Sequence, residues 1–208
     1  DVFTHTATML NLMAESIADG SAPDLSPDQR RQLAYAILLH DIGKPPTATH
    51  DGQRIRFNCH AAVGATMTEA LLRRLRFSNT DTEAITRIVH DHMRFMDVRT
   101  MRNATLRRMV GAPTFPVELE LHRLDCLGSH GDIGNVLHLQ EFIHRLAREP
   151  ALPAPWITGH DLLALGLPRG PRIGFWHQKA YDAQLEGAFP DREALLDWLK
   201  TALQTPEP

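Results

Sequence analysis

The chain has 208 residues, a hydrophobic fraction of 43%, a charged fraction of 23% and a formal net charge of -3 at pH 7. These values are typical of a globular protein, and they argue against one that coats nucleic acid non-specifically through a high positive charge. No apolar run approaches the ~20 residues that cross a bilayer, so we expect no membrane association. Two cysteines cannot form a disulfide framework, so we expect free thiols and a cytoplasmic location.

The first quarter of the chain contains two predicted helices. Apolar residues at helical spacing predict the first over residues 2–17, with His5 near its start. Ser26 and Gln29 form the capping box of the second, with proline at its first position. We expect this second helix to end at the doublet of His40 and Asp41.

The remaining pattern is also helical, and we predict an all-α fold. Prolines and glycines over residues 43–58 predict a loop with a short strand at 54–57. Thr80 and Glu83 suggest a second capping box. Further helices are expected at residues 60–75, from 80 to the histidines at 90 and 92, at 104–110, from Pro116 through Asp125, at 135–148, 159–165, 172–185 and 191–203.

Three prolines within residues 150–155 are the clearest linker in the chain. We therefore expect a large helical domain over residues 1–149 and a small helical tail over 150–208. Positive charge is concentrated in the first of these, because residues 73–108 hold nine arginines against four carboxylates. This segment suggests a phosphate-bearing partner, although arginines on solvated helix faces explain it equally well.

Imidazole and carboxylate side chains recur at predicted helix ends or within apolar helix faces. Twelve histidines in one chain point to metal or proton chemistry. Convergence of the helices would gather six such side chains around a divalent ion and relieve the cost of burying them unpaired. Mixed imidazole and carboxylate ligation suits Fe, Mn, Co, Ni or Zn better than Ca. The six residues are His5, His40, Asp41, His60, His92 and Asp125.

The chain resembles the HD-domain phosphohydrolases, and in particular the HD region and C-terminal tail of bacterial CCA-adding tRNA nucleotidyltransferases. The resemblance rests on short motifs spread over essentially the whole chain. These motifs are VFTHT at residues 2–6, HDIGKP at 40–45, HAAVG at 60–64, RLRFSN at 74–79, HMRF at 92–95, HRLDC at 122–126, TGHDL at 158–162, LGL at 165–167, GPRIG at 170–174 and QLEG at 184–187.

This resemblance implies an all-helical HD bundle that binds one or two divalent ions, with Mn, Fe, Co, Ni, Mg and Zn not distinguishable. It implies that a first ion is held by His5, His40, Asp41 and Asp125. In two-metal members the aspartate of the doublet bridges to a second ion, for which His60 and His92 are the matching positions. His90 is the alternative to His92, because both lie near the end of one helix.

The resemblance further implies hydrolysis of a phosphomonoester or a 2′,3′-cyclic phosphodiester on a nucleotide or an RNA 3′ end. Asp41 and Lys44 are the expected catalytic residues, and Lys44, Arg94 and Arg123 are the candidates for binding phosphate. The polymerase motifs of the nucleotidyltransferases, a Gly-Ser turn with paired aspartates, do not occur in this sequence, so we expect no nucleotide addition by the chain itself. The alternative function is a non-catalytic tRNA-binding body and tail of such an enzyme. Oligomeric state is left open.

Overall fold

The computed structural model describes residues 1–50, 52–146 and 149–204. Contacts along the chain group them into two compact units. The first comprises Asp1–Arg99 and Ala112–Phe142, and the second comprises Thr100–Gly111 and the residues from Ile143 onward. The predicted all-α fold is confirmed, since the described residues form helices with one two-stranded sheet.

The first unit is a bundle of helices joined by short connections. Its strands pair antiparallel, with Thr49 opposite Arg56. Its elements are α1 Val2–Ala18, α2 Pro27–Leu39, α3 Lys44–Thr47, β1 Thr49–His50, β2 Ile55–Arg56, α4 His60–Arg74, α5 Asn79–Asp91, the 3-10 helix η1 His92–Thr100, α7 Phe115–Gly128 and α8 Gly134–Arg145. Helix α8 belongs to this unit as far as Phe142.

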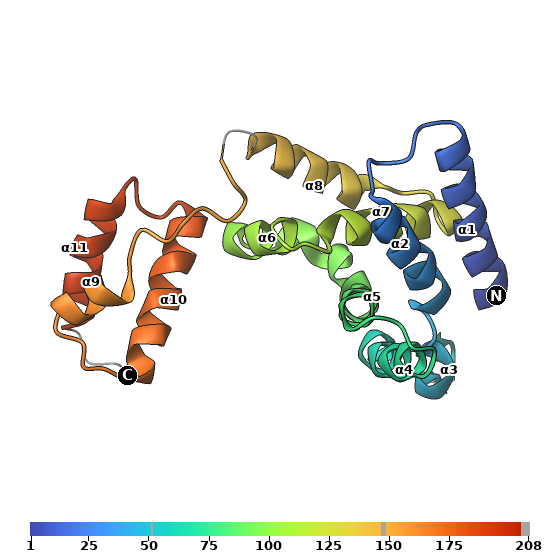
Figure 1. Cartoon of the computed structure of the whole chain (residues 1–208), viewed down its shortest axis with the longest axis horizontal. Helices are drawn as coiled ribbons and strands as arrows, with labels where there is room; N and C mark the ends of the chain where they lie inside the picture. Colours follow the sequence, from blue (N-terminus) through green and yellow to red (C-terminus); the bar gives the residue numbers. More distant parts are fainter. Residues whose placement is uncertain (51, 147–148, 205–208) are drawn as a thin grey trace. The chain divides into compact units, whose positions relative to one another are not determined.

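Apolar clusters of the described residues hold the first unit together, and two of them surround the helix ends that matter below. Helices α1, α2 and α7 lie side by side (Figure 1), and with α5 they bury a core that includes Met9, Leu33, Ile88 and Leu121. Helices α4 and α5 pack as a pair against the end of α2 through Leu39, Leu72, Ile85 and Val89. The end of α2, the start of α4 and the end of α5 therefore meet within one packed structure.

The second unit has its own apolar core. The helices of this unit are α6 Asn103–Val110, α9 Gly159–Ala164, α10 Pro171–Glu186 and α11 Arg192–Ala202. Trp176 and Ala180 of α10 pack with Leu162 of α9 and Leu195 and Leu199 of α11. This core explains why the chain beyond the proline-rich segment is a structured helical tail.

Helix α6 contacts α10, so the contacts group residues 100–111 with the tail and not with the bundle. Arg108 forms an ion pair with Asp182, and the backbone N–H of Ala104 donates to Glu186 Oε1 at 3.1 Å. The contacts thus divide the chain differently from a boundary at residue 150, and the 1–149 and 150–208 domain assignment stays a prediction.

Most predicted helices are confirmed to within two residues, but three details differ. Helix α5 is capped by Ser78, whose side chain accepts the N–H of Asp81 at 3.0 Å, so the predicted Thr80–Glu83 capping box is wrong. Helix α3 and the 3-10 helix η1 were not expected. The predicted end of one helix at residues 147–148 lies outside the described residues.

Among the described residues, none of the helices combines the length and the apolar character needed to cross a membrane.

Candidate metal centre

Helix ends deliver the predicted ligands to one place in the first unit. His40 is the C-cap residue of α2, and Asp41 lies in the turn that follows; both are buried. His60 is the first residue of α4, and His92 is the first residue after α5. Buried carboxylate and imidazole groups need partners, and at these helix ends they find one another.

The four imidazole rings form a continuous row. Ring centroids are 5.6 Å apart for His5 and His40, 5.5 Å for His40 and His92, and 5.1 Å for His60 and His92. Asp41 lies beside this row, with its carboxylate oxygens 3.4 Å from His40 Nε2 and 3.6 Å from His60 Nε2.

Asp41 is shared by two groups of possible ligands. One comprises His5, His40 and Asp41, and the other comprises Asp41, His60 and His92; within each group the ligand atoms lie within 4.8 Å of one another. Asp125 reaches the cluster through His5, because its Oδ1 is 3.0 Å from His5 Nε2. The structure thus brings all six predicted residues together.

Backbone carbonyls orient every ring in this cluster. Each Nδ1 faces the oxygen of a carbonyl, a contact that favours a proton on Nδ1, so that a neutral ring presents the lone pair of its Nε2 to the cluster. Sequence reasoning missed these carbonyls, because any residue can supply one. The pairs are His5 with Gly128 at 3.3 Å, His40 with Ile37 at 3.0 Å, His60 with Phe57 at 2.8 Å and His92 with Val89 at 2.6 Å.

This arrangement fits a cation. His60 Nε2 and His92 Nε2 are 3.1 Å apart, so two lone pairs face each other, and His40 Nε2 is buried without a hydrogen-bond partner. A divalent metal ion satisfies such atoms, whereas an apolar or hydrogen-bonded core would not leave them unpaired. The cluster can therefore hold a metal ion.

The ionisation of Asp41 and His92 suits metal binding, whereas at His40 burial is outweighed by the Asp41 carboxylate, which raises the pKa of the imidazole, so an ion bound there would displace a proton. Burial opposes the charged form of Asp41, yet His40 and Lys44 beside it hold the pKa of this carboxyl well below its usual range. Burial, together with the neighbouring imidazoles of His40 and His60, lowers the pKa of His92 to about 4. A carboxylate and a neutral imidazole are the forms that coordinate metals.

Gly43 allows the doublet and helix α4 to approach closely. A Cβ atom on Gly43 would lie 2.1 Å from the carbonyl oxygen of His60 and 2.7 Å from the backbone nitrogen of Gly64. Only glycine leaves room for this contact, which places the start of α4, and hence His60, beside Asp41. The glycine of the HDIGK motif is the sequence signal for this feature.

Lys44 is the cation nearest to the doublet among the predicted phosphate-binding residues. Its Nζ lies 2.6 Å from Asp41 Oδ2 and 5.8 Å from the centroid of the Phe57 ring. Arg94 is paired with Asp91 at 3.0 Å, and Arg123 makes two hydrogen bonds of 2.7 Å to Glu120. Either arginine would have to leave its carboxylate to bind phosphate, so their assigned role stays a prediction.

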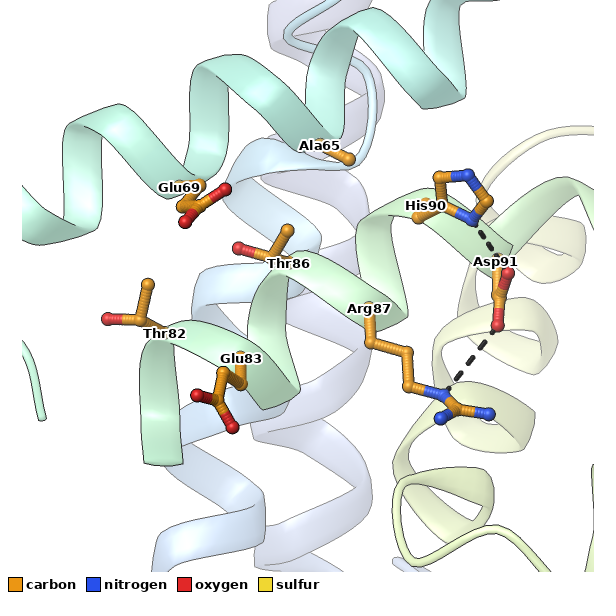
Figure 2. Close-up of a pocket in the computed structure, with 8 residues that line it drawn as sticks. All are labelled: Ala65, Glu69, Thr82, Glu83, Thr86, Arg87, His90 and Asp91. Carbon is orange, nitrogen blue, oxygen red and sulfur yellow. Dashed lines mark hydrogen bonds and ion pairs between the residues drawn. The ribbon is translucent and has the colours of Figure 1, made fainter. Parts of the chain in front are cut away.

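His90 faces a different part of the unit from His92. It lines a pocket of about 400 Å³ between α4 and α5, where its Nδ1 lies 2.8 Å from Asp91 Oδ1 (Figure 2). Glu69, Thr82 and Arg87 line the same pocket. Of the two alternatives left open by the sequence, the geometry brings His92 to the ligand cluster.

Comparison with known proteins agrees with this picture. The family model described as HD domain matches residues 2–127. The chain is 32% identical over 183 residues to an A-adding tRNA nucleotidyltransferase of Deinococcus radiodurans, which covers 84% of this chain and 40% of that protein. It is 31% identical over 174 residues to a CC-adding tRNA nucleotidyltransferase of Thermus thermophilus, covering 81% of this chain and 39% of that protein.

A shorter match joins the chain to a bifunctional uridylyltransferase/uridylyl-removing enzyme of a Bradyrhizobium species. It is 28% identical over 86 residues and covers 41% of this chain and 8% of that enzyme. The chain spans about two fifths of the length of the two tRNA nucleotidyltransferases. These matches confirm the predicted resemblance to their HD region.

Proposed function

The chain belongs to the HD-domain family, and on this premise we propose that it is a divalent-metal-dependent phosphohydrolase. The substrate we propose is a phosphomonoester or a 2′,3′-cyclic phosphodiester on a nucleotide or an RNA end. The observation that carries the proposal is the largely buried row of imidazoles, whose Nε2 atoms converge beside Asp41.

The cluster would bind two metal ions. Asp41, His40, His5 and Asp125 would hold one ion, and His60 and His92 would hold a second that shares Asp41. A divalent ion in such a site supplies a lowered pKa for water and stabilises negative charge on phosphate oxygens.

Lys44 would position the phosphoryl group. Its ammonium lies 2.6 Å from Asp41 Oδ2 with its side chain 28% exposed, so the charge is held at the edge of the cluster and can still be reached from solvent. Positive charge placed there before the substrate arrives stabilises the charge that develops on a phosphate oxygen. The carbonyls behind the histidines hold their rings so that the Nε2 atoms are presented to the cluster for ligation.

Hydrolysis by the chelator-treated chain tests this proposal. Phosphate release from nucleoside monophosphates and ring opening of nucleoside 2′,3′-cyclic phosphates are measured with added Mn²⁺, Co²⁺, Ni²⁺ or Mg²⁺. We expect metal-dependent activity that falls at least about a hundredfold in His40→Ala and Asp41→Ala and persists in His90→Ala. Equal activity in all four proteins would exclude the proposal, and circular dichroism checks that each variant remains helical.

A second candidate is a tRNA-binding role without catalysis. It is favoured by the similarity to A-adding and CC-adding tRNA nucleotidyltransferases over more than four fifths of this chain. Binding of a tRNA transcript that weakens steeply with salt would support it, because phosphate contacts release counterions. Absence of binding at low salt would count against it.

A further inference from the structure

A second cavity lies in the first unit, and the six ligand candidates do not line it. Its volume is about 370 Å³, which is near the lower end of the ~300–1,000 Å³ range of small-molecule sites. It lies between the 3-10 helix η1 and the C-terminal part of α7 with the turn that follows. The lining residues are Met96, His122, Cys126, His130, Asp132 and Asn135.

The two helical elements that form this cavity also carry metal-ligand candidates. Helix η1 begins with His92, and α7 holds Asp125 between the cavity residues His122 and Cys126. The carboxylate of Asp125 lies close enough to interact electrostatically with both His122 and Cys126. The cavity therefore lies close to Asp125, which pairs with His5 of the candidate metal centre.

Part of the cavity wall is suited to a flat aromatic ring. The imidazole of His122 stacks on Phe95 with a centroid distance of 4.8 Å, so its ring is held in a fixed plane. Met96 is 57% exposed although it is a large apolar side chain. Thioether and ring surfaces at one cavity favour contact with another π-system.

The polar groups of the cavity provide a donor and an acceptor. The backbone N–H of Asp132 donates to His130 Nδ1 at 3.1 Å, which leaves the proton of a neutral His130 on Nε2 as a donor. Asp132 Oδ1 accepts the N–H of Gly134 at 2.8 Å, and its carboxylate has further acceptor capacity. The side-chain amide of Asn135 accepts a hydrogen bond from Arg99 and donates one to the carbonyl of Phe95, so we assign it a structural role in the cavity wall.

The charged side chains around the cavity determine which part of a nucleotide it can bind. Asp132 lines it and Asp125 lies next to it, and these two carboxylates outnumber the guanidinium of Arg99 that is bound to Asn135, so a phosphate placed inside would meet an excess of negative charge. An uncharged nucleoside meets no such repulsion, and a base has the flat face and the polar edge that the wall residues match. The phosphate is instead directed to the metal centre.

We infer that this cavity binds the nucleoside part of the substrate, with the base between Met96 and His122 and its edge at His130 and Asp132. The inference rests on the proposed function, because that function places a phosphate at the neighbouring cluster. It makes the cavity the site that distinguishes nucleotides from other phosphate esters.

Nucleoside binding tests this inference without the need for hydrolysis. Adenosine, guanosine, cytidine and uridine are titrated into the full chain by calorimetry. We expect at least one to bind, and Met96→Ala to weaken its binding about tenfold through loss of the contact between the thioether and the base. Met93→Ala is the matched control, since Met93 is an exposed methionine of the same helix that does not line the cavity. Equal affinities in the two variants, or no binding of any nucleoside, would overturn the inference.

Substrate comparison provides the second readout. For Asp132→Asn, which keeps an acceptor for the N–H of Gly134, we expect kcat/KM for a nucleoside monophosphate to fall relative to kcat/KM for glycerol 2-phosphate, which has no base. A parallel loss on both substrates would overturn the inference. If nucleosides bind in a Met96-dependent manner and the parent hydrolyses no phosphate ester, the proposed function fails while the cavity assignment is supported.

Discussion

At the scale of single residues, the candidate metal centre depends on backbone atoms as much as on its ligands. Four carbonyls orient four imidazoles, and Gly43 lets the backbone of α4 lie against the HD doublet. A ligand that is held in this way does not have to be ordered when the ion binds, so less entropy is lost on binding.

Substitution of Gly43 by alanine tests the close contact directly. The added Cβ would meet backbone atoms that cannot move independently, so we expect a loss of about 3 kcal/mol or more in the free energy of unfolding. Chemical denaturation measures this change. We also expect weaker metal binding, because His60 would be displaced.

Gly174→Ala is the matched control for Gly43→Ala. Gly174 lies inside helix α10, and a Cβ there would meet no atom within 4 Å. Alanine should therefore raise stability by roughly 0.5–1 kcal/mol, as in other helix interiors. If both substitutions had the same effect, the close contact at Gly43 would not be the cause.

Buried Glu118 predicts a dependence of stability on pH. Burial raises the pKa of this carboxyl above its ordinary value of 4.5, although Thr114 donates a hydrogen bond to it and Arg87 and Arg94 lie nearby. The folded state therefore binds the proton more tightly than the unfolded state, and the free energy of unfolding falls as pH rises from 4.5 through the raised pKa.

Glu118→Gln removes this ionisation and keeps an acceptor for Thr114. We expect the stability of the variant, relative to the parent, to increase between pH 4 and pH 8. Thermal denaturation over this pH range measures the difference. A difference that stays constant with pH, or that shrinks as pH rises, would contradict the assignment.

The sequence could identify the ligand types but not what orients them. His5, His40, Asp41 and Asp125 match a family motif, and each is a residue type with few other uses in a buried position. The sequence favoured His92 over His90 only weakly, because their different directions depend on how α5 gives way to a 3-10 helix. The carboxylates that pair with Arg94 and Arg123 lie three residues before them, at Asp91 and Glu120, so helical spacing could have indicated both pairs, a signal that our predictions did not use.

At the scale of helices and turns, the positions of the helix ends matter most. The spacing of apolar residues marks the extent of the helices that deliver His40, His60 and His92, and a correctly predicted capping box marks the start of α2, so their bounds were predicted nearly correctly. The 3-10 helix was missed because its buried residues, His92, Phe95 and Val98, recur every three residues over too short a span to show a period.

The cap of α5 gives a test at this scale. Ser78→Ala removes the acceptor for the N–H of Asp81, and we expect it to cost about 1 kcal/mol of stability. Thr80→Ala should change stability by less than about 0.5 kcal/mol, because the helix begins before Thr80. Urea denaturation of both variants makes the comparison. A larger loss in Thr80→Ala would restore the capping box predicted from the sequence.

At the scale of the whole molecule, the two compact units divide the chain in an order that sequence alone did not suggest. Residues 100–111 belong by contacts with the unit that contains the tail, although they are followed by α7 of the first unit. Proline content marks a linker but does not reveal which helix an isolated segment packs against. The packing of α6 on α10 is such a tertiary contact.

Truncation after residue 149 tests this division. The shortened chain lacks α10, so α6 loses its partners at Asp182 and Glu186. We expect amide hydrogens of α6 to exchange faster in the truncated chain, while those of α1, α2 and α7 keep their protection. Unchanged protection of α6 would show that residues 100–111 are held by the first unit.

The central claim is that the imidazole and carboxylate cluster binds a divalent ion, and calorimetric titration of the chelator-treated chain with Mn²⁺ or Co²⁺ tests it most directly. We predict saturable binding that weakens at least about tenfold in His40→Ala and His92→Ala and is unchanged in His90→Ala. Equal affinity in the parent and in His40→Ala, or no binding by the parent, would contradict the account.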